Sequence, residues 1–270
     1  MKHVKFIILT FLILESIDLS AQCKIENTYF AAGEELVYDM YFKYGLINTK
    51  AGKSSMTISD DKYEGKDVLK MQLIGNTKGM ASKFVSLSDT LTSFMSKEVV
   101  PLAYIKNAHE SGDHTIEKAA YSYNNNKITI KTNRIRNDEL RFDEELSSGS
   151  CIYDMLSVVY YARTIDYSTM MKGDKVSISF LSGKRIVSMD IEDHGIEVMN
   201  ANDNKKYDCI KLVLVINAEA FEDKKEAMTV YITNDSNRIP VRIDSKLKIG
   251  STRAILKSYK GNKHPVKVVN

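Results

Sequence analysis

Two histidines and two acidic residues lie close together in the segment His109–His114 and are the first candidates for chemistry. Imidazole and carboxylate groups bind zinc, but a His-Glu-x-x-His site places its two histidines four positions apart on one face of a helix. Here the histidines are five positions apart, and the turn-forming residues Ser111–Asp113 lie between them. We therefore expect a polar hairpin tip rather than a metal site.

Cys151 is a second candidate, because Gly149 and Ser150 precede it at the predicted start of a helix. Free backbone N–H groups at such a position can stabilise a thiolate or an oxyanion. No nucleophile-elbow motif surrounds this cysteine, and no histidine has a spacing that identifies it as the base. We expect Ser150 to cap a helix beside a buried cysteine.

Runs of carboxylates at Glu34–Glu35 and Asp143–Glu145 raise the question of glycoside hydrolysis. That chemistry requires two separated carboxyl groups that face one sugar, which adjacency in sequence does not provide. We interpret both runs as solvated loop charge. The chain also lacks a glycine-rich phosphate loop, a dinucleotide-binding fingerprint and regular Cys/His spacing, so the sequence predicts no catalytic residue, metal site or cofactor.

Apolar residues at alternate positions dominate the chain, as in Val176, Ile178 and Phe180 before the turn at Ser182–Gly183. Polar clusters separate further alternating segments, at residues 60–67, 124–126, 202–204 and 235–237. This period of two is typical of β-hairpins. Helices do not alternate with strands, so we predict a mainly β fold: a large antiparallel, strongly curved sheet or partly closed barrel.

One helix is predicted over about residues 152–165, in the middle of this sheet protein. Apolar residues recur there at helical spacing: Ile152, Met155, Leu156, Val159 and Tyr160. With Ser150 as its N-cap, Asp154 lies near the positive end of the helix dipole and Arg163 near the negative end. We expect the apolar face to pack on the sheet.

The N-terminus indicates export. Lys2 and Lys5 precede the apolar run Phe6–Leu14, and the small residues Ser20 and Ala21 follow. This pattern is typical of a signal peptide, and the run is too short for a transmembrane helix, which needs about 20 apolar residues. We predict a signal peptide at residues 1–21 and a single mainly β domain at residues 22–270, in the periplasm or outside the cell, with or without association with the outer membrane.

The three cysteines, Cys23, Cys151 and Cys209, allow three pairings that the sequence does not distinguish. We expect them to be small buried hydrophobic side chains without a disulfide. A lipid anchor on Cys23 is not expected, because Gln22 stands where lipoprotein processing favours a small residue. The formal net charge of +3 indicates no strong field, which argues against nucleic acid as a partner.

Three segments of the sequence together resemble one known family. They are Ala32–Tyr38 (AGEELVY), Tyr153–Arg163 (YDMLSVVYYAR) and Tyr231–Val241 (YITNDSNRIPV). In this order and spacing they are similar to the bacterial domain-of-unknown-function 3108 family, from about Phe30 to Tyr259. The resemblance implies an exported or envelope protein with a strongly curved, partly closed antiparallel sheet. It implies no activity and no catalytic residues.

The chain has 15 tyrosines, nine phenylalanines and no tryptophan, many of them at alternating strand positions. If side chains do not fill the concave face of the curved sheet, these positions would line an apolar pocket for a lipid or another amphiphile. The expected lining residues are Tyr38, Met40, Phe42, Met155, Val159 and Tyr160.

Three function classes follow from this interpretation. The first is a non-enzymatic binding or carrier module for a hydrophobic or amphiphilic envelope component, and we favour it by analogy of fold. The alternative is a structural or assembly protein that binds envelope proteins or surface glycan through an exposed strand edge or aromatic patch. A hydrolase would require His109, His114 or Cys151 to meet a carboxylate or a base across the fold.

Overall fold

The structure of the chain is a computed structural model that describes residues 23–77, 87–110, 112–124, 127–217, 225–246 and 250–269. The predicted signal peptide at residues 1–21 lies outside the described residues. Most of the described chain is β-strand, and it includes the α-helix α1 (Ser157–Thr164) and the short 3-10 helix η3 (Tyr167–Thr169).

The strands are β1 (Glu35–Tyr44), β2 (Ile47–Tyr63), β3 (Lys66–Thr77), β4 (Leu87–Met95), β5 (Pro101–Glu110), β6 (Asp113–Asn124), β7 (Lys127–Arg136), β8 (Glu139–Ser148), β9 (Ile152–Tyr153), β10 (Lys175–Ser182), β11 (Arg185–Asn200), β12 (Lys206–Asn217), β13 (Lys225–Thr233), β14 (Pro240–Lys246) and β15 (Ser251–Lys260).

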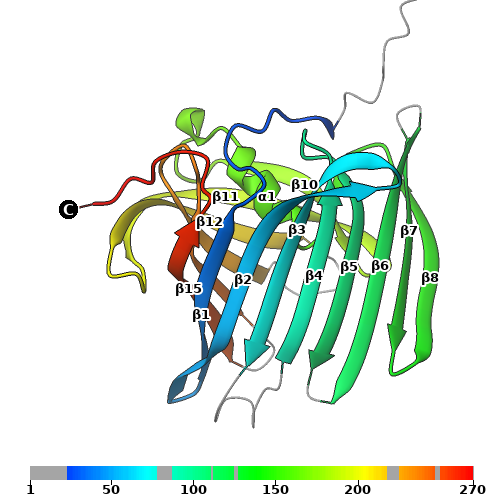
Figure 1. Cartoon of the computed structure of the whole chain (residues 1–270), viewed down its shortest axis with the longest axis horizontal. Coiled ribbons are helices and arrows are strands. Elements are labelled where there is room, and N and C mark those ends of the chain that lie inside the picture. The colour runs from blue at the N-terminus through cyan, green and yellow to red at the C-terminus, as the bar shows by residue number, and fades with distance from the viewer. Residues whose placement is uncertain are drawn as a thin grey trace, which may run out of the picture.

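All 15 strands form one sheet, in which the order is β8 to β1 followed by β15 to β9. Each half is a meander, and the two halves join where the first long strand, β1, pairs with the last, β15. Neighbours are antiparallel except β9 and β10, which are parallel. The sheet curves into a nearly closed, barrel-like wall (Figure 1), so the prediction of a mainly β, curved antiparallel fold is confirmed.

The two ends of the sheet approach each other without pairing as strands among the described residues. The hydroxyl of Thr132 on β7 donates a hydrogen bond to the carbonyl oxygen of Gly183, in the turn between β10 and β11, at 3.3 Å. The guanidinium of Arg134 lies 5.1 Å from the ring centroid of Phe142 on β8, beside the same turn. Side-chain contacts therefore close the wall where backbone pairing stops.

The predicted hairpins are present, with one difference in a turn. β10 and β11 turn at Gly183, and the clusters at 124–126, 202–204 and 235–237 separate paired strands as predicted, although Asn125 and Asn126 are outside the described residues. The turn predicted over 60–67 is confined to Glu64 and Gly65, whose φ angles are +49° and +77°. The polar residues on either side continue the two strands, because their side chains face solvent.

The helix is shorter than predicted. Its first residue is Ser157, not Ile152, because Ile152 and Tyr153 form β9 and pair with Ser179 and Phe180 of β10. Ser150 is therefore not the N-cap, and its backbone N–H donates to the hydroxyl of Ser148 at 2.9 Å. Residues 154–156 form a turn after the strand, and the helix that follows has eight residues.

Helix α1 packs inside the curved sheet, and it buries two faces rather than one. Leu156 and Tyr160 belong to an apolar cluster with Leu36 and other residues of the β1–β7 half. Val158 and Ala162 belong to a second cluster that includes Phe180, Ile191 and Leu212 of β10–β12. Figure 1 shows α1 near the upper rim of the barrel-like sheet, between these two walls. The helix therefore fills part of the interior and joins the two halves of the core.

An ion pair inside the core fixes α1 relative to the sheet. Nη1 and Nη2 of Arg163 donate to Oε1 and Oε2 of Glu34 at 2.6 and 2.7 Å, and Arg163 and Glu34 are 0% and 1% exposed. Arg163 also donates to the carbonyl oxygen of Asn237 at 2.9 Å, and its guanidinium lies 4.9 Å from the ring centroid of Phe30. The prediction that Glu34 is solvated loop charge is wrong, because Arg163 satisfies both oxygens of its buried carboxylate.

A disulfide joins Cys23 to Cys151 over a sequence separation of 128, and Cys209 is a buried free cysteine. The expectation that all three cysteines are unpaired is therefore wrong. The bond ties the N-terminal segment to the chain just before β9, where Cys151 contacts both apolar clusters. A Cys23 sulfur in this bond is not available for a thioether to lipid.

The disulfide makes a prediction about stability and about thiol count. Replacing both cysteines, Cys23→Ser with Cys151→Ser, should lower the free energy of unfolding by about 2–5 kcal/mol, since the unfolded chain gains the freedom of a long loop. Guanidinium denaturation followed by circular dichroism measures this change. Maleimide labelling of the unfolded, unreduced protein provides the control: it should modify Cys209 alone, and labelling of all three cysteines would contradict the bond.

The buried ion pair makes a second prediction. Glu34→Gln or Arg163→Met should each cost about 3–5 kcal/mol of stability, because each leaves one charged group buried without its partner. The double variant should lose clearly less than the sum of the two single losses, which a double-mutant cycle by guanidinium denaturation measures. The pair Lys62–Asp67, with side chains 72% and 75% exposed, is the control and should show almost no coupling. If the loss of stability in the double variant equals the sum of the two single losses, Glu34 and Arg163 do not form a buried ion pair.

Candidate functional site

The histidine cluster forms a hairpin tip, as the sequence predicts. His109 and His114 face each other across β5 and β6, with their rings stacked at a centroid distance of 4.1 Å. Nε2 of His114 lies 2.9 Å from Oδ1 of Asn107, an exposed interaction within the same hairpin. Within the described segments, no group of three or more His, Cys, Asp or Glu side chains has the geometry to hold a metal ion.

The other two candidates for chemistry are explained by structure. Cys151 is bonded to Cys23, so its sulfur is not a thiol nucleophile. Glu34 is bound to Arg163 in the core, and Asp143–Glu145 lie exposed on β8, at the edge of the sheet. The fold does not bring these acidic groups together.

An apolar cavity of about 250 Å³ lies on the concave side of the sheet, beneath the segment that leads into α1. Its wall comes from β1 to β4 and from β13 to β15. Four of the six expected lining residues border it: Tyr38 and Met40 on β1, and Met155 and Val159 at the helix. The cavity is larger than the roughly 150 Å³ apolar cavity known to hold benzene and just below the roughly 300–1,000 Å³ of common ligand sites.

The other two expected residues lie elsewhere. Phe42 is at the far end of β1, where its ring approaches Gly250 at the start of β15. Tyr160 is fully buried in the core, 5.1 Å from the ring centroid of Phe30 in an edge-to-face contact. The alternation along β1 predicted that Phe42 faces the same side as Tyr38 and Met40, but it did not show where along the strand the cavity ends. The predicted helix began too early, so it did not show that Tyr160 points into the core instead of toward the cavity.

A buried carboxylate holds the helical side of the cavity in place. Oδ1 of Asp154 accepts hydrogen bonds from the backbone N–H groups of Leu156 and Ser157 at 2.9 and 2.8 Å. Its Oδ2 accepts from the hydroxyl of Ser93 on β4 at 3.0 Å. Burial raises the pKa of this carboxyl, and the four hydrogen-bonding groups on Ser157, Leu156 and Ser93 oppose that rise. Asp154 therefore caps the helix and joins the segment before it, which contains the half-exposed Met155, to β4.

The opposite wall is fixed by Tyr38, whose hydroxyl donates to the carbonyl oxygen of Pro240 at 2.9 Å. This contact joins β1 to the start of β14, on the other side of β15. Burial raises the pKa of the Tyr38 hydroxyl well above its usual value, so it remains a neutral donor. Its ring is thus held in one orientation along the cavity.

Sequence reasoning missed the one acidic residue that borders the cavity, Asp89 on β4. It is 9% exposed, and its Oδ1 has no hydrogen-bond partner. Burial, and then repulsion from Glu110, raise the pKa of the Asp89 carboxyl to about 6. The signal was available: Leu87, Asp89 and Leu91 alternate, so an acid occupies a position where the strand pattern places an apolar residue.

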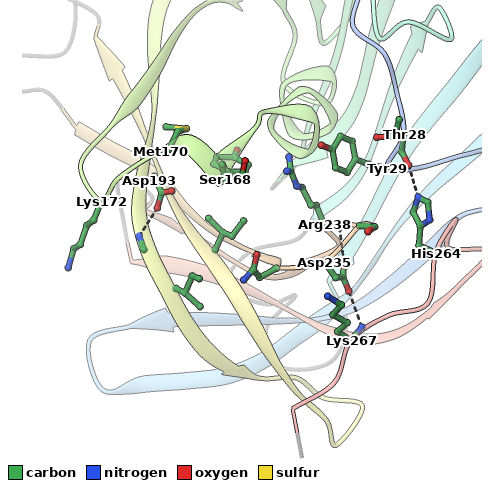
Figure 2. A pocket seen from close by; sticks show the side chains of 16 residues that line it. Thr28, Tyr29, Ser168, Met170, Lys172, Asp193, Asp235, Arg238, His264 and Lys267 are labelled. Carbon is green, nitrogen blue, oxygen red and sulfur yellow. Dashed lines mark hydrogen bonds between the residues drawn. The ribbon is translucent and has the colours of Figure 1, made fainter.

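A larger pocket of about 850 Å³ lies near the C-terminal segment, and its walls combine polar and apolar surface. Arg238 stacks on Tyr29 at 4.2 Å, and Oδ2 of Asp235 accepts from the backbone N–H of Lys267 at 3.0 Å. Nε2 of His264 lies 2.7 Å from the carbonyl oxygen of Thr28. Figure 2 shows these side chains at one side of the pocket. Because they already bind their neighbours, we assign them to holding the segments around Thr28 and His264 against the turn between β13 and β14.

Among the residues that the structure describes, no helix combines the length and the apolar character needed to span a membrane.

Comparison with solved structures supports the fold. A crystal structure described as a β-barrel-like protein of domain of unknown function DUF1849, from Brucella abortus, superposes with a TM-score of 0.59 at 8% identity, over 87% of this chain and 99% of that chain. A protein of Bacteroides fragilis described as exported, with a YmcC-like fold, has a TM-score of 0.33 at 11% identity, over 88% and 100% of the two chains. A Parabacteroides distasonis protein described as a lipoprotein has a TM-score of 0.32 at 12% identity, over 88% and 99%. At such identities only the fold is comparable, and only the first score is high enough for that.

Comparison by sequence identifies the family. A search of curated proteins finds no significant match. The model of the family described as "Protein of unknown function (DUF3108)" matches residues 37–257, which confirms the resemblance seen in the three segments. The chain therefore belongs to the DUF3108 family of proteins of unknown function.

Proposed function

We propose that the protein is an exported, non-enzymatic binding or carrier module that holds the apolar part of an amphiphilic envelope component in the cavity beneath α1. The observation on which this rests is the cavity itself: about 250 Å³, bordered by seven strands and the helix, and lined largely by apolar side chains such as Met40 and Val159. Burying an apolar segment there gains about 25 cal/mol per Å² of apolar surface removed from water. A cavity of this size would take a ring or part of an acyl chain.

Two observations support location in the envelope. The N-terminal sequence has the pattern of a signal peptide. The Cys23–Cys151 disulfide is suited to an oxidising compartment such as the periplasm, because cytosolic thiols are kept reduced. The two observations are independent, since one concerns residues before the domain and the other its folded core.

The groups that border the cavity favour binding over catalysis. The candidate nucleophile Cys151 is oxidised in a disulfide, and the histidine pair lies at an exposed hairpin tip rather than in the cavity wall. Asp89 borders the cavity, but among the described residues the wall contains no histidine, no cysteine and no second carboxylate. A carrier needs shape and apolar surface, which this wall supplies.

Two neighbouring serines on β2 provide a matched test. Ser54 borders the cavity between Tyr38 and Gly75, whereas Ser55 lies on the outer face, between Val37 and Ile74. Ser54→Leu should weaken binding of the uncharged fluorescent probe N-phenylnaphthylamine by about tenfold or more, because overfilling an apolar site costs about 1–3 kcal/mol. Ser55→Leu should leave the dissociation constant within about twofold. Fluorescence titration measures both.

The test has a clear negative outcome. If the wild-type protein does not take up the probe, or if both leucine variants bind it like wild type, the cavity is not a binding site. The alternative role in envelope assembly would then be favoured. Native mass spectrometry of protein purified from its own envelope, before and after organic extraction, identifies the mass of a bound component.

A further inference from the structure

The apolar cavity contains one feature that an apolar ligand alone does not explain, the carboxylate of Asp89. The residue is 9% exposed and its Oδ1 has no hydrogen-bond partner among the described residues. Leaving a buried polar group unsatisfied costs about 1–3 kcal/mol, and more when the group is charged. A bound ligand that donates a hydrogen bond at this position would remove that cost.

The charges around Asp89 indicate what such a ligand would carry. On β5, Nζ of Lys106 binds Oε1 of Glu110 at 2.9 Å, so the nearest cation is already paired. On β15, the Arg253 side chain also borders the cavity, but its Nε binds Oδ1 of Asp244 at 2.8 Å. On β6, Glu117 is bound by Arg134 of β7. Asp89 forms hydrogen bonds with the Glu110 side chain and the His109 backbone, and Lys106 attracts its carboxylate from a distance. Among the groups named, however, it is the carboxylate with no cation in direct contact, and its Oδ1 has no donor.

The remaining neighbours add no positive charge. The helical side of the cavity is formed by Met155, Leu156 and Val159, and the titratable group on β1, the Tyr38 hydroxyl, already donates to Pro240. The backbone of His109 lies opposite Ser88, and its imidazole stacks on His114 at the hairpin tip. The cavity is therefore apolar over most of its wall and negative at one point.

We propose that the component bound in this cavity is an amphiphile with a protonated amine, whose ammonium group donates to Asp89 while its hydrocarbon part fills the apolar space. The inference rests on the proposed binding function and specifies its ligand class. An ammonium–carboxylate hydrogen bond is charge-assisted and stronger than a neutral one. An anionic head, such as that of a fatty acid, would instead meet Asp89 and Glu110 as like charges.

Three amphiphiles with the same hydrocarbon chain test the inference: dodecylamine, dodecanol and dodecanoate. Each displaces N-phenylnaphthylamine from the mature protein at about pH 7.5, below its own critical micelle concentration. Dodecylamine should bind at least about tenfold more tightly than dodecanol, a difference of about 1.4 kcal/mol, and dodecanoate should bind most weakly. Asp89→Asn should remove the preference for the amine. Asp67→Asn, on an exposed side chain with the same change of charge, should retain it.

The wild-type protein provides a second test that needs no substitution. Because the pKa of Asp89 is raised to about 6, its carboxylate gains a proton as the pH falls through that value. The alkylammonium group remains charged, as lysine does below about pH 10, and the alcohol does not titrate. The ratio of amine to alcohol affinity should therefore fall as the pH is lowered from about 8 to about 5.

The outcomes separate this inference from the proposed function. If the probe binds and Ser54→Leu blocks it, but amine and alcohol bind equally at all pH values, the cavity is a binding site and the role of Asp89 is wrong. If Asp89→Asn retains the preference for the amine, the charge argument is overturned. If neither the probe nor any of the three amphiphiles binds the wild-type protein, both proposals fail.

Discussion

Burial of the Arg163 guanidinium is the constraint on which the arrangement of the chain depends. A cation with 0% exposure is tolerated only when its donors are satisfied, and here the carboxylate of Glu34 and the carbonyl oxygen of Asn237 satisfy them. These three residues belong to the three segments on which the family resemblance rests. The start of β1, the helix and the turn between β13 and β14 must therefore meet at one point. If any of them moved away, a charged group would remain in an apolar core without a partner.

The number of strands explains why a helix must lie inside. Side chains fill the interior of a barrel of about eight strands, and wider barrels leave space that other elements must fill. In this sheet of 15 strands, α1 fills one part of the interior, and the Glu117–Arg134 pair lies on the inner face of β6 and β7. Helix α1 has only eight residues, because Ile152 and Tyr153 form β9 and residues 154–156 form the turn before the helix. The space that the short helix does not cover is the cavity between Met155 and the strands of β1 to β4.

The sequence predicted the strands well because alternation is a local signal with a direct physical cause, the burial of one face. Other predictions failed at three places where contacts distant in sequence decide the outcome. Glu34 looks like surface charge until Arg163, on a helix far along the chain, is placed beside it. Ile152 fits a helical pattern, but pairing with β10 is available only in the folded sheet. The disulfide joins residues 128 apart, and no property of either cysteine alone identifies the other. From aromatic and apolar residues at alternating positions, the sequence led us to expect an apolar pocket on the concave face of the sheet. It did not show the extent of that pocket, because the extent depends on the position of the helix.

Asp89 occupies a position where stability alone would favour a different residue. The strand pattern Leu87–Asp89–Leu91 places its side chain on the inner face, where a leucine or valine would bury apolar surface at no electrostatic cost. The carboxylate is retained at a point where the interior is not filled, and its pKa of about 6 reflects both its burial and the nearby charge of Glu110. The other buried carboxylates near the helix, Glu34 and Asp154, are each satisfied by protein donors. Asp89 also forms hydrogen bonds, with the side chain of Glu110 and the backbone of His109, but its Oδ1 remains without a donor in the wall of the apolar cavity beneath α1. The Oδ1 of Asp89 has no donor in the protein and borders a space that the protein leaves open, and a ligand group that enters this space and donates to it is the simplest explanation of that oxygen.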